Sequence, residues 1–179
     1  MVSSIHPDLT MAELLEVYPG AQRALFRQYH IGGCSSCGFQ PGETLASVCT
    51  RNENLSVSEV IDYLEKSQVD DEKSLISPAE GSTALERGDA RFLDIRTREE
   101  YEAVHIEGSH LFSQDLLAEI TASWDKTALL VIVDHQGKRV LDAAAYFAGH
   151  GFTDVRGLAG GIDAWSEQID PDLPRYHLE

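Results

Sequence analysis

Hydrophobic positions in the first third of the chain recur at the three- and four-residue spacing of amphipathic helices. Four such stripes are present: Met11, Leu14, Leu15 and Tyr18; Leu25, Phe26 and Tyr29; Leu45, Val48 and Cys49; Val57, Val60, Ile61 and Leu64. A glutamate three residues after Thr10, and another three after Ser56, predicts a capping box at the start of the first and last helices. Residues 7–66 are therefore expected to form a small all-α domain.

From residue 74 onward the pattern alternates between short apolar runs and amphipathic stretches. The apolar runs, expected to be strands, are SLIS (74–77), RFLDI (91–95), ALLVIV (128–133) and TDV (153–155). The run at 128–133 is the most hydrophobic and predicts a central strand buried on both faces. This alternation predicts an α/β domain over residues 74–169, with a parallel sheet and flanking helices. The polar, acidic stretch 67–73 is expected to be a linker, and residues 170–179 a C-terminal tail.

Composition and charge narrow the possible partners. The chain has 179 residues, with 42% hydrophobic and 25% charged side chains and a formal net charge of −16. That charge argues against nucleic acid and anionic membranes as partners, because both would be repelled. No apolar run approaches the roughly 18 residues that a membrane span requires. The start, MVSSIHPDLT, lacks the pattern of a signal peptide, so a cytoplasmic location is expected. Nothing in the sequence indicates a cofactor.

The segment VIVDHQGKR (131–139) predicts a strand, a short glycine-containing loop and then a helix. Loops of this kind bind anions through backbone N–H groups and the following helix N-terminus. The candidate binding residues are Asp134, His135, Gln136, Gly137, Lys138 and Arg139.

Several motifs in residues 74–169 resemble the rhodanese (sulfurtransferase) family. They are LDIRTREEYEAVHIEGS (93–109), the loop itself, and GFTDVRGLAGGIDAW (151–165). The resemblance implies a rhodanese-like fold. In that family a nucleophilic cysteine occupies the first loop position, where this chain has Asp134, and an arginine the position of Arg139. Because a carboxylate cannot carry transferable sulfur, thiosulfate sulfurtransferase activity is not expected.

Two orientations of Asp134 remain open from the sequence. Its carboxylate could fill the anion-binding loop, or pair with Arg139, and so plug the site from within. Alternatively, the side chain could point to solvent or simply cap the following turn.

All three cysteines, Cys34, Cys37 and Cys49, lie in the first third of the chain. The segment GGCSSCG (32–38) and its flanks resemble the redox-disulfide domain associated with hybrid cluster proteins, also described as a domain of unknown function. Three interpretations remain open. Cys34 and Cys37 could form a catalytic redox pair; the three cysteines could bind zinc or an iron–sulfur cluster; or the cysteines could be structural.

These observations predict an accessory redox or sulfur-handling protein. The CxxC domain would carry the thiol chemistry, and the rhodanese-like domain would serve as a catalytically inactive docking or anion-binding module. Its partner would be an unidentified redox or sulfur-carrier protein. The alternatives are a non-enzymatic interaction protein and a metal-binding or iron–sulfur protein.

Overall fold

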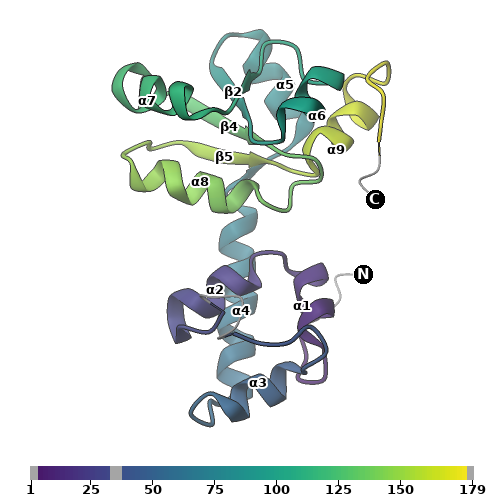
Figure 1. Ribbon diagram of the computed structural model, residues 1–179, viewed down its shortest axis with the longest axis vertical. Helices are drawn as coiled ribbons and strands as arrows, with labels where there is room; N and C mark the ends of the chain where they lie inside the picture. Colours follow the sequence, from purple (N-terminus) through teal and green to yellow (C-terminus); the bar gives the residue numbers. More distant parts are fainter. Residues whose placement is uncertain (1–3, 33–37, 177–179) are drawn as a thin grey trace. The chain divides into compact units, whose positions relative to one another are not determined.

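A computed structural model describes residues 4–32 and 38–176 (Figure 1). The chain divides into two compact units, residues 1–73 and 74–179. Each is described by itself below, as the N-terminal unit and the C-terminal unit. No helix in the described ranges is long and apolar enough to cross a bilayer.

The N-terminal unit is helical. Its helices are α1 (Met11–Val17), α2 (Ala21–Tyr29), α3 (Leu45–Arg51) and α4 (Val57–Glu72). The predicted capping box at Thr10 is present. The one predicted at Ser56 is wrong: its hydroxyl contacts Ser58 and caps no backbone N–H. Helix α4 continues to Glu72, so most of the stretch expected as a linker is helical.

Except for Phe26 of the second stripe, which is exposed, the predicted apolar stripes of the N-terminal unit meet in one core. Its fully buried members include Met11, Leu14, Leu25, Leu45 and Leu64, one or more from each helix. Burying such side chains is the main favourable contribution to the stability of a small helical unit.

Asp71, at the end of α4, joins that helix to the α1–α2 region. Its Oδ2 accepts hydrogen bonds from the Tyr18 hydroxyl and the Arg23 guanidinium, both at 2.5 Å. Burial, reinforced by the neighbouring Asp71 carboxylate, raises the pKa of Tyr18 far above its usual value.

The C-terminal unit contains a five-stranded sheet of order β1-β5-β4-β2-β3, in which every pairing is parallel. The strands are β1 (Leu75–Ile76), β2 (Ala90–Asp94), β3 (His110–Leu111), β4 (Leu129–Val133) and β5 (Val155–Leu158). The helices are α5 (Pro78–Glu86), α6 (Arg98–Ala103), α7 (Gln114–Ser123), α8 (Val140–Gly149) and α9 (Gly161–Gln168). The predicted α/β class is confirmed, although β5 begins two residues later than the sequence pattern indicated and β3 was not predicted.

Alternate residues of β4 enter two separate cores. Val131 and Val133 pack with Ile162 and Trp165 on the face that α9 covers, whereas Leu130 and Ile132 pack with residues of α7 and α8 on the other. Figure 1 shows α8 and α9 on either side of the sheet. Because β4 is buried on both faces, its sequence is uniformly hydrophobic rather than alternating.

Candidate functional site

The six candidate binding residues, 134–139, form the loop between the carboxyl end of β4 and the start of α8. Ligands commonly bind beyond the carboxyl ends of parallel strands in open α/β sheets. In this loop Asp134 is buried, with 2% of its surface exposed, whereas Gln136, Lys138 and Arg139 are exposed. The structure thus places the six residues together, with only the carboxylate directed inward.

The Asp134 side chain is bonded to the backbone of its own loop. Its Oδ1 accepts a hydrogen bond from the Gly137 N–H, and its Oδ2 accepts one from the Arg139 N–H at 2.8 Å. The carboxylate therefore occupies N–H groups that would otherwise be available to an anion, and in the same contacts it caps the turn into α8. Arg139 contributes its backbone N–H to this arrangement, and its guanidinium forms no ion pair with Asp134.

The first turn of α9 fixes the outer side of the loop. The Ile162 N–H donates to the Asp134 carbonyl at 2.9 Å, and the Asp163 N–H donates to the His135 carbonyl at 3.1 Å. This approach requires glycine at Gly161, because a Cβ there would lie 2.5 Å from the Asp134 carbonyl oxygen. Gly137 is equally constrained: its φ is +80°, and a Cβ would lie 2.7 Å from the Gly160 nitrogen.

A hollow of about 470 Å³ opens between this loop and the start of α6. Its lining residues are Thr97, Glu100, Asp134, His135, Gln136, Lys138 and Arg139. Within the described ranges, the side chains of Lys138 and Arg139 have no hydrogen-bond or ion-pair partner. The carboxylates of Glu100 and Asp134 both accept hydrogen bonds. Two basic and two acidic side chains thus line the hollow, and the exposed basic pair, Lys138 and Arg139, is the part of the lining that suits an anionic group.

A buried ion pair between Arg96 and Asp94 supports the side of the hollow that Thr97 and Glu100 form. Arg96 donates to both oxygens of Asp94, with the shortest distance 2.6 Å, and to the Val104 carbonyl at 2.8 Å. Burial alone would lower the pKa of Arg96, but hydrogen bonds from its guanidinium to Asp94 and Tyr176 outweigh that effect and raise it. The Arg96 guanidinium therefore remains charged in the interior.

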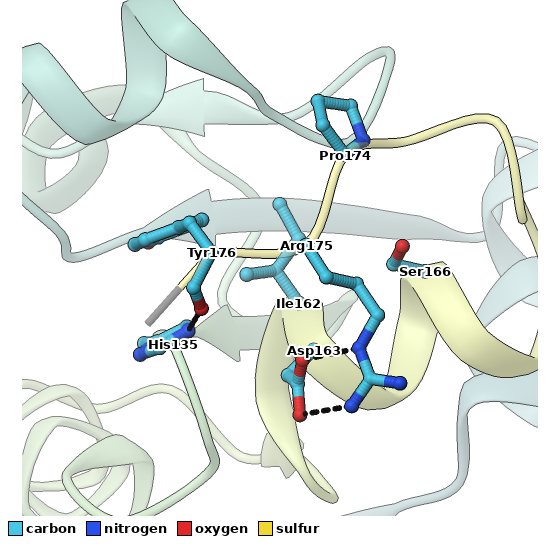
Figure 2. A pocket seen from close by; sticks show the side chains of 7 residues that line it. All are labelled: His135, Ile162, Asp163, Ser166, Pro174, Arg175 and Tyr176. Atoms are coloured by element: carbon cyan, nitrogen blue, oxygen red, sulfur yellow. Dashed lines mark hydrogen bonds and ion pairs between the residues drawn. The ribbon is translucent and has the colours of Figure 1, made fainter. Parts of the chain in front are cut away.

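The C-terminal segment completes the site, and no local sequence pattern predicted this. The Tyr176 ring stacks on His135 at 4.3 Å between centroids, and its carbonyl accepts a hydrogen bond from His135 Nε2 at 2.9 Å (Figure 2). The Tyr176 hydroxyl donates to Glu100 at 2.7 Å and accepts from Arg96 at 2.8 Å. The segment that was expected to be only a C-terminal tail thus connects the loop 134–139, the Asp94–Arg96 ion pair and helix α6.

Of the three cysteines, only Cys49 lies within the described residues. Cys34 and Cys37 lie outside the described residues, so their proposed pairing remains a prediction. Cys49 lies in α3 within the hydrophobic core, with 1% of its surface exposed, and burial raises the pKa of its thiol. In the ranges 4–32 and 38–176, no three His, Cys, Asp or Glu side chains are grouped so that they could hold a metal ion.

Comparisons with known proteins agree with this architecture. The family profile of the rhodanese-like domain matches residues 77–168. The chain is 35% identical over 104 residues to thiosulfate sulfurtransferase GlpE of Pseudomonas aeruginosa (strain LESB58), a match that covers 58% of this chain and 94% of that protein. It is 33% identical over 106 residues to the probable adenylyltransferase/sulfurtransferase MoeZ of Mycobacterium tuberculosis (strain CDC 1551 / Oshkosh), covering 58% of this chain and 27% of that protein.

Among solved structures, the human single-domain sulfurtransferase TSTD1 is 27% identical, with 53% of this chain and 96% of that chain covered and a TM-score of 0.47. The profile match extends from the start of α5 to the end of α9 and includes the loop that holds Asp134. This profile match shows that the chain belongs to the rhodanese-like family.

Proposed function

We propose that this protein is an accessory redox or sulfur-handling protein whose rhodanese-like domain does not itself transfer sulfur. The observation that carries the proposal is the position of the Asp134 carboxylate, which takes the N–H groups of Gly137 and Arg139. Sulfur transfer requires a thiolate at this place, because the enzyme must hold the sulfur as a persulfide between two half-reactions.

The loop then serves as an anion-binding or docking module. The cationic rim formed by Lys138 and Arg139 remains open to the hollow, although the carboxylate occupies the loop's inner N–H groups. The thiol chemistry is assigned to Cys34 and Cys37, which lie in the other unit.

A steady-state assay of sulfur transfer from thiosulfate to cyanide tests the catalytic part of this proposal. The wild-type protein is expected to give no rate above the uncatalysed background. The variant Asp134→Cys tests whether the loop still has the geometry for catalysis once a thiol is supplied. Turnover by the wild-type protein that Asp134→Ala abolishes would contradict the assignment of an inactive rhodanese-like domain.

Differential alkylation followed by mass spectrometry tests the redox part. Cys34 and Cys37 should be modified together after reduction and protected together after mild oxidation. Cys49 should resist alkylation in the folded protein, because its thiol is buried and its pKa is raised. A Cys34→Ser variant in which Cys37 no longer cycles is the matched control.

Two alternatives make different predictions in the same experiments. If Cys34 and Cys37 never oxidise at physiological potentials and elemental analysis finds no metal, the protein is a non-enzymatic interaction module. The metal-binding alternative requires stoichiometric zinc or iron. The burial of Cys49 in an apolar core argues against its service as a third ligand.

A further inference from the structure

Residues 173–176, here called the C-terminal strap, lie against the loop after β4 and against α9 (Figure 2), and the surface that they contact is called the groove below. The Ser166 hydroxyl donates to the Leu173 carbonyl at 2.5 Å. Arg175 forms a two-point contact with the Asp163 carboxylate at 2.7 and 2.9 Å. Together with the stacking of Tyr176 on His135, these contacts bind consecutive parts of an extended chain, as peptide-binding grooves do.

At the position of Tyr176, the surrounding side chains bind a hydroxyl group. Arg96 is buried, and the Tyr176 hydroxyl supplies its NH1 group with an acceptor while donating to Glu100. Whatever replaces Tyr176 must therefore offer both an acceptor and a donor at that point, because an unpaired polar group on buried Arg96 is unfavourable. The phenol hydroxyl of a tyrosine meets both requirements, and its flat ring also stacks on His135.

The middle of the strap is weakly attached, whereas Leu173 and Tyr176 at its two ends pack against the core. Residues 173–176 form no helix or strand, and Pro174 and Arg175 are exposed. The Arg175 side chain is 45% exposed where it pairs with Asp163, and ion pairs so open to water contribute little to stability. Segments with few buried apolar atoms and exposed hydrogen bonds open before the rest of a domain unfolds.

We propose that this groove is a docking site for an extended peptide in which a basic residue precedes a tyrosine. In the absence of a partner, residues 173–176 of the same chain occupy it. This proposal rests on the docking role proposed above and names the chemistry of the partner. Displacement of the strap would uncover one face of His135, which also lines the hollow beside Lys138 and Arg139.

Fluorescence anisotropy with a labelled peptide that copies residues 170–176 (DPDLPRY) tests the proposal on the full-length protein. The double variant Arg175→Glu/Tyr176→Ala weakens the resident strap and should bind the peptide at least tenfold more tightly than the wild type does. A peptide with phenylalanine in place of the tyrosine should bind about tenfold more weakly, because Arg96 would lose its acceptor. Arg156→Glu, an equivalent charge change at another exposed arginine, should behave as wild type.

Equal affinity of the folded double variant and the wild type would overturn the proposal. If the double variant fails to fold, hydrogen exchange of the wild-type protein decides instead. Exchange in residues 173–176 should be faster than in β4 and should quicken further on addition of the peptide. Exchange as slow as that of β4 would mean that the segment is an integral part of the domain and not a displaceable strap.

Sedimentation of the wild-type protein tests the other possible occupant. A concentration-dependent dimer that the double variant abolishes would assign the groove to the strap of a second copy and contradict occupation in cis. The assays of sulfur transfer and thiol oxidation do not depend on the strap, so failure of this inference and failure of the proposed function give different results.

Discussion

The two units of this protein differ in what they bury. In the described part of the N-terminal unit the core consists of hydrophobic side chains and one cysteine. The C-terminal unit buries, in addition, polar or charged side chains: Asp94, Arg96, Ser109, Asp134 and Ser166. Burial of such groups is unfavourable unless every hydrogen bond is satisfied.

Four of these five buried groups belong to one network. Asp134 holds the loop, Asp94 and Arg96 support Tyr176, and Ser166 holds the strap. No buried side-chain nitrogen or oxygen in the described ranges lacks a hydrogen-bond partner. Polar burial in this protein is therefore concentrated around one loop, even though that loop lacks a thiol.

The largest expected effect is that of Asp94→Ala, which leaves the buried Arg96 without its counter-charge. Removal of one partner from a buried ion pair typically lowers the free energy of unfolding by about 3–5 kcal/mol. Both tryptophans, Trp124 and Trp165, lie in the C-terminal unit, so tryptophan fluorescence during urea denaturation measures this unit.

Glu102→Ala is the matched control for Asp94→Ala. Its carboxylate pairs with Arg98 at 3.9 Å on the surface, where both side chains are about two-thirds exposed or more. A change of at most about 0.5 kcal/mol is expected. Equal effects of the two substitutions would show that the buried pair is not what distinguishes the C-terminal unit.

Asp134→Ala should come next. It removes the acceptor of two backbone N–H groups, at an expected cost of about 1–3 kcal/mol in the free energy of unfolding. Millimolar thiosulfate should then raise the melting temperature of the variant more than that of the wild type, because an anion can now also bind the vacated N–H groups. The same thermal shift in both proteins would mean that Asp134 does not exclude anions from the loop.

A smaller effect is expected in the N-terminal unit from Asp71→Ala. Its carboxylate also binds two side chains, but its exposure of 19% allows water to replace them. We expect a loss of about 1 kcal/mol in the free energy of local opening, measured by hydrogen exchange in α2 and α4. Asp70→Ala, whose pair with Lys73 is fully open to solvent, should leave exchange unchanged. A loss as large as that for Asp94→Ala would remove the contrast between the units.

The smallest effect is the response of Glu100 to Tyr176→Phe. Burial tends to raise the pKa of Glu100, but hydrogen bonds from Thr97 and Tyr176 outweigh it and hold the pKa below its usual value. Loss of the tyrosine hydroxyl should raise the pKa of Glu100, as carboxyl NMR titration can measure. Glu80, whose pKa is lowered by its own capping box with Ser77, should not respond.

The sign of the accompanying pH effect follows from linkage. Because the pKa of Glu100 is lower in the folded state, the group contributes stability above its unfolded pKa of about 4.3, and that contribution is lost as the pH falls through the folded value. The loss on acidification should be smaller in Tyr176→Phe than in the wild type. An unchanged acid response would indicate that the hydroxyl does not stabilise the Glu100 carboxylate.

The sequence alone determined the elements whose signals are local. Apolar stripes predicted the four N-terminal helices, and the run at 128–133 predicted the central strand, because both depend on the periodicity of neighbouring residues. The loop 134–139 was located in the same way, between a buried strand and a helix. The capping box at Thr10 is equally local, whereas the failure at Ser56 shows that a capping motif does not guarantee the bond.

Only the tertiary structure decided where Asp134 points and what Tyr176 does. The sequence left the carboxylate free to face solvent, and its contacts became fixed when the turn of α9 closed on the loop through Gly161. Tyr176 is 41 residues from His135 and 80 from Arg96. Such pairings carry no local pattern, because they arise when segments distant in the chain are brought together over the carboxyl ends of a parallel sheet.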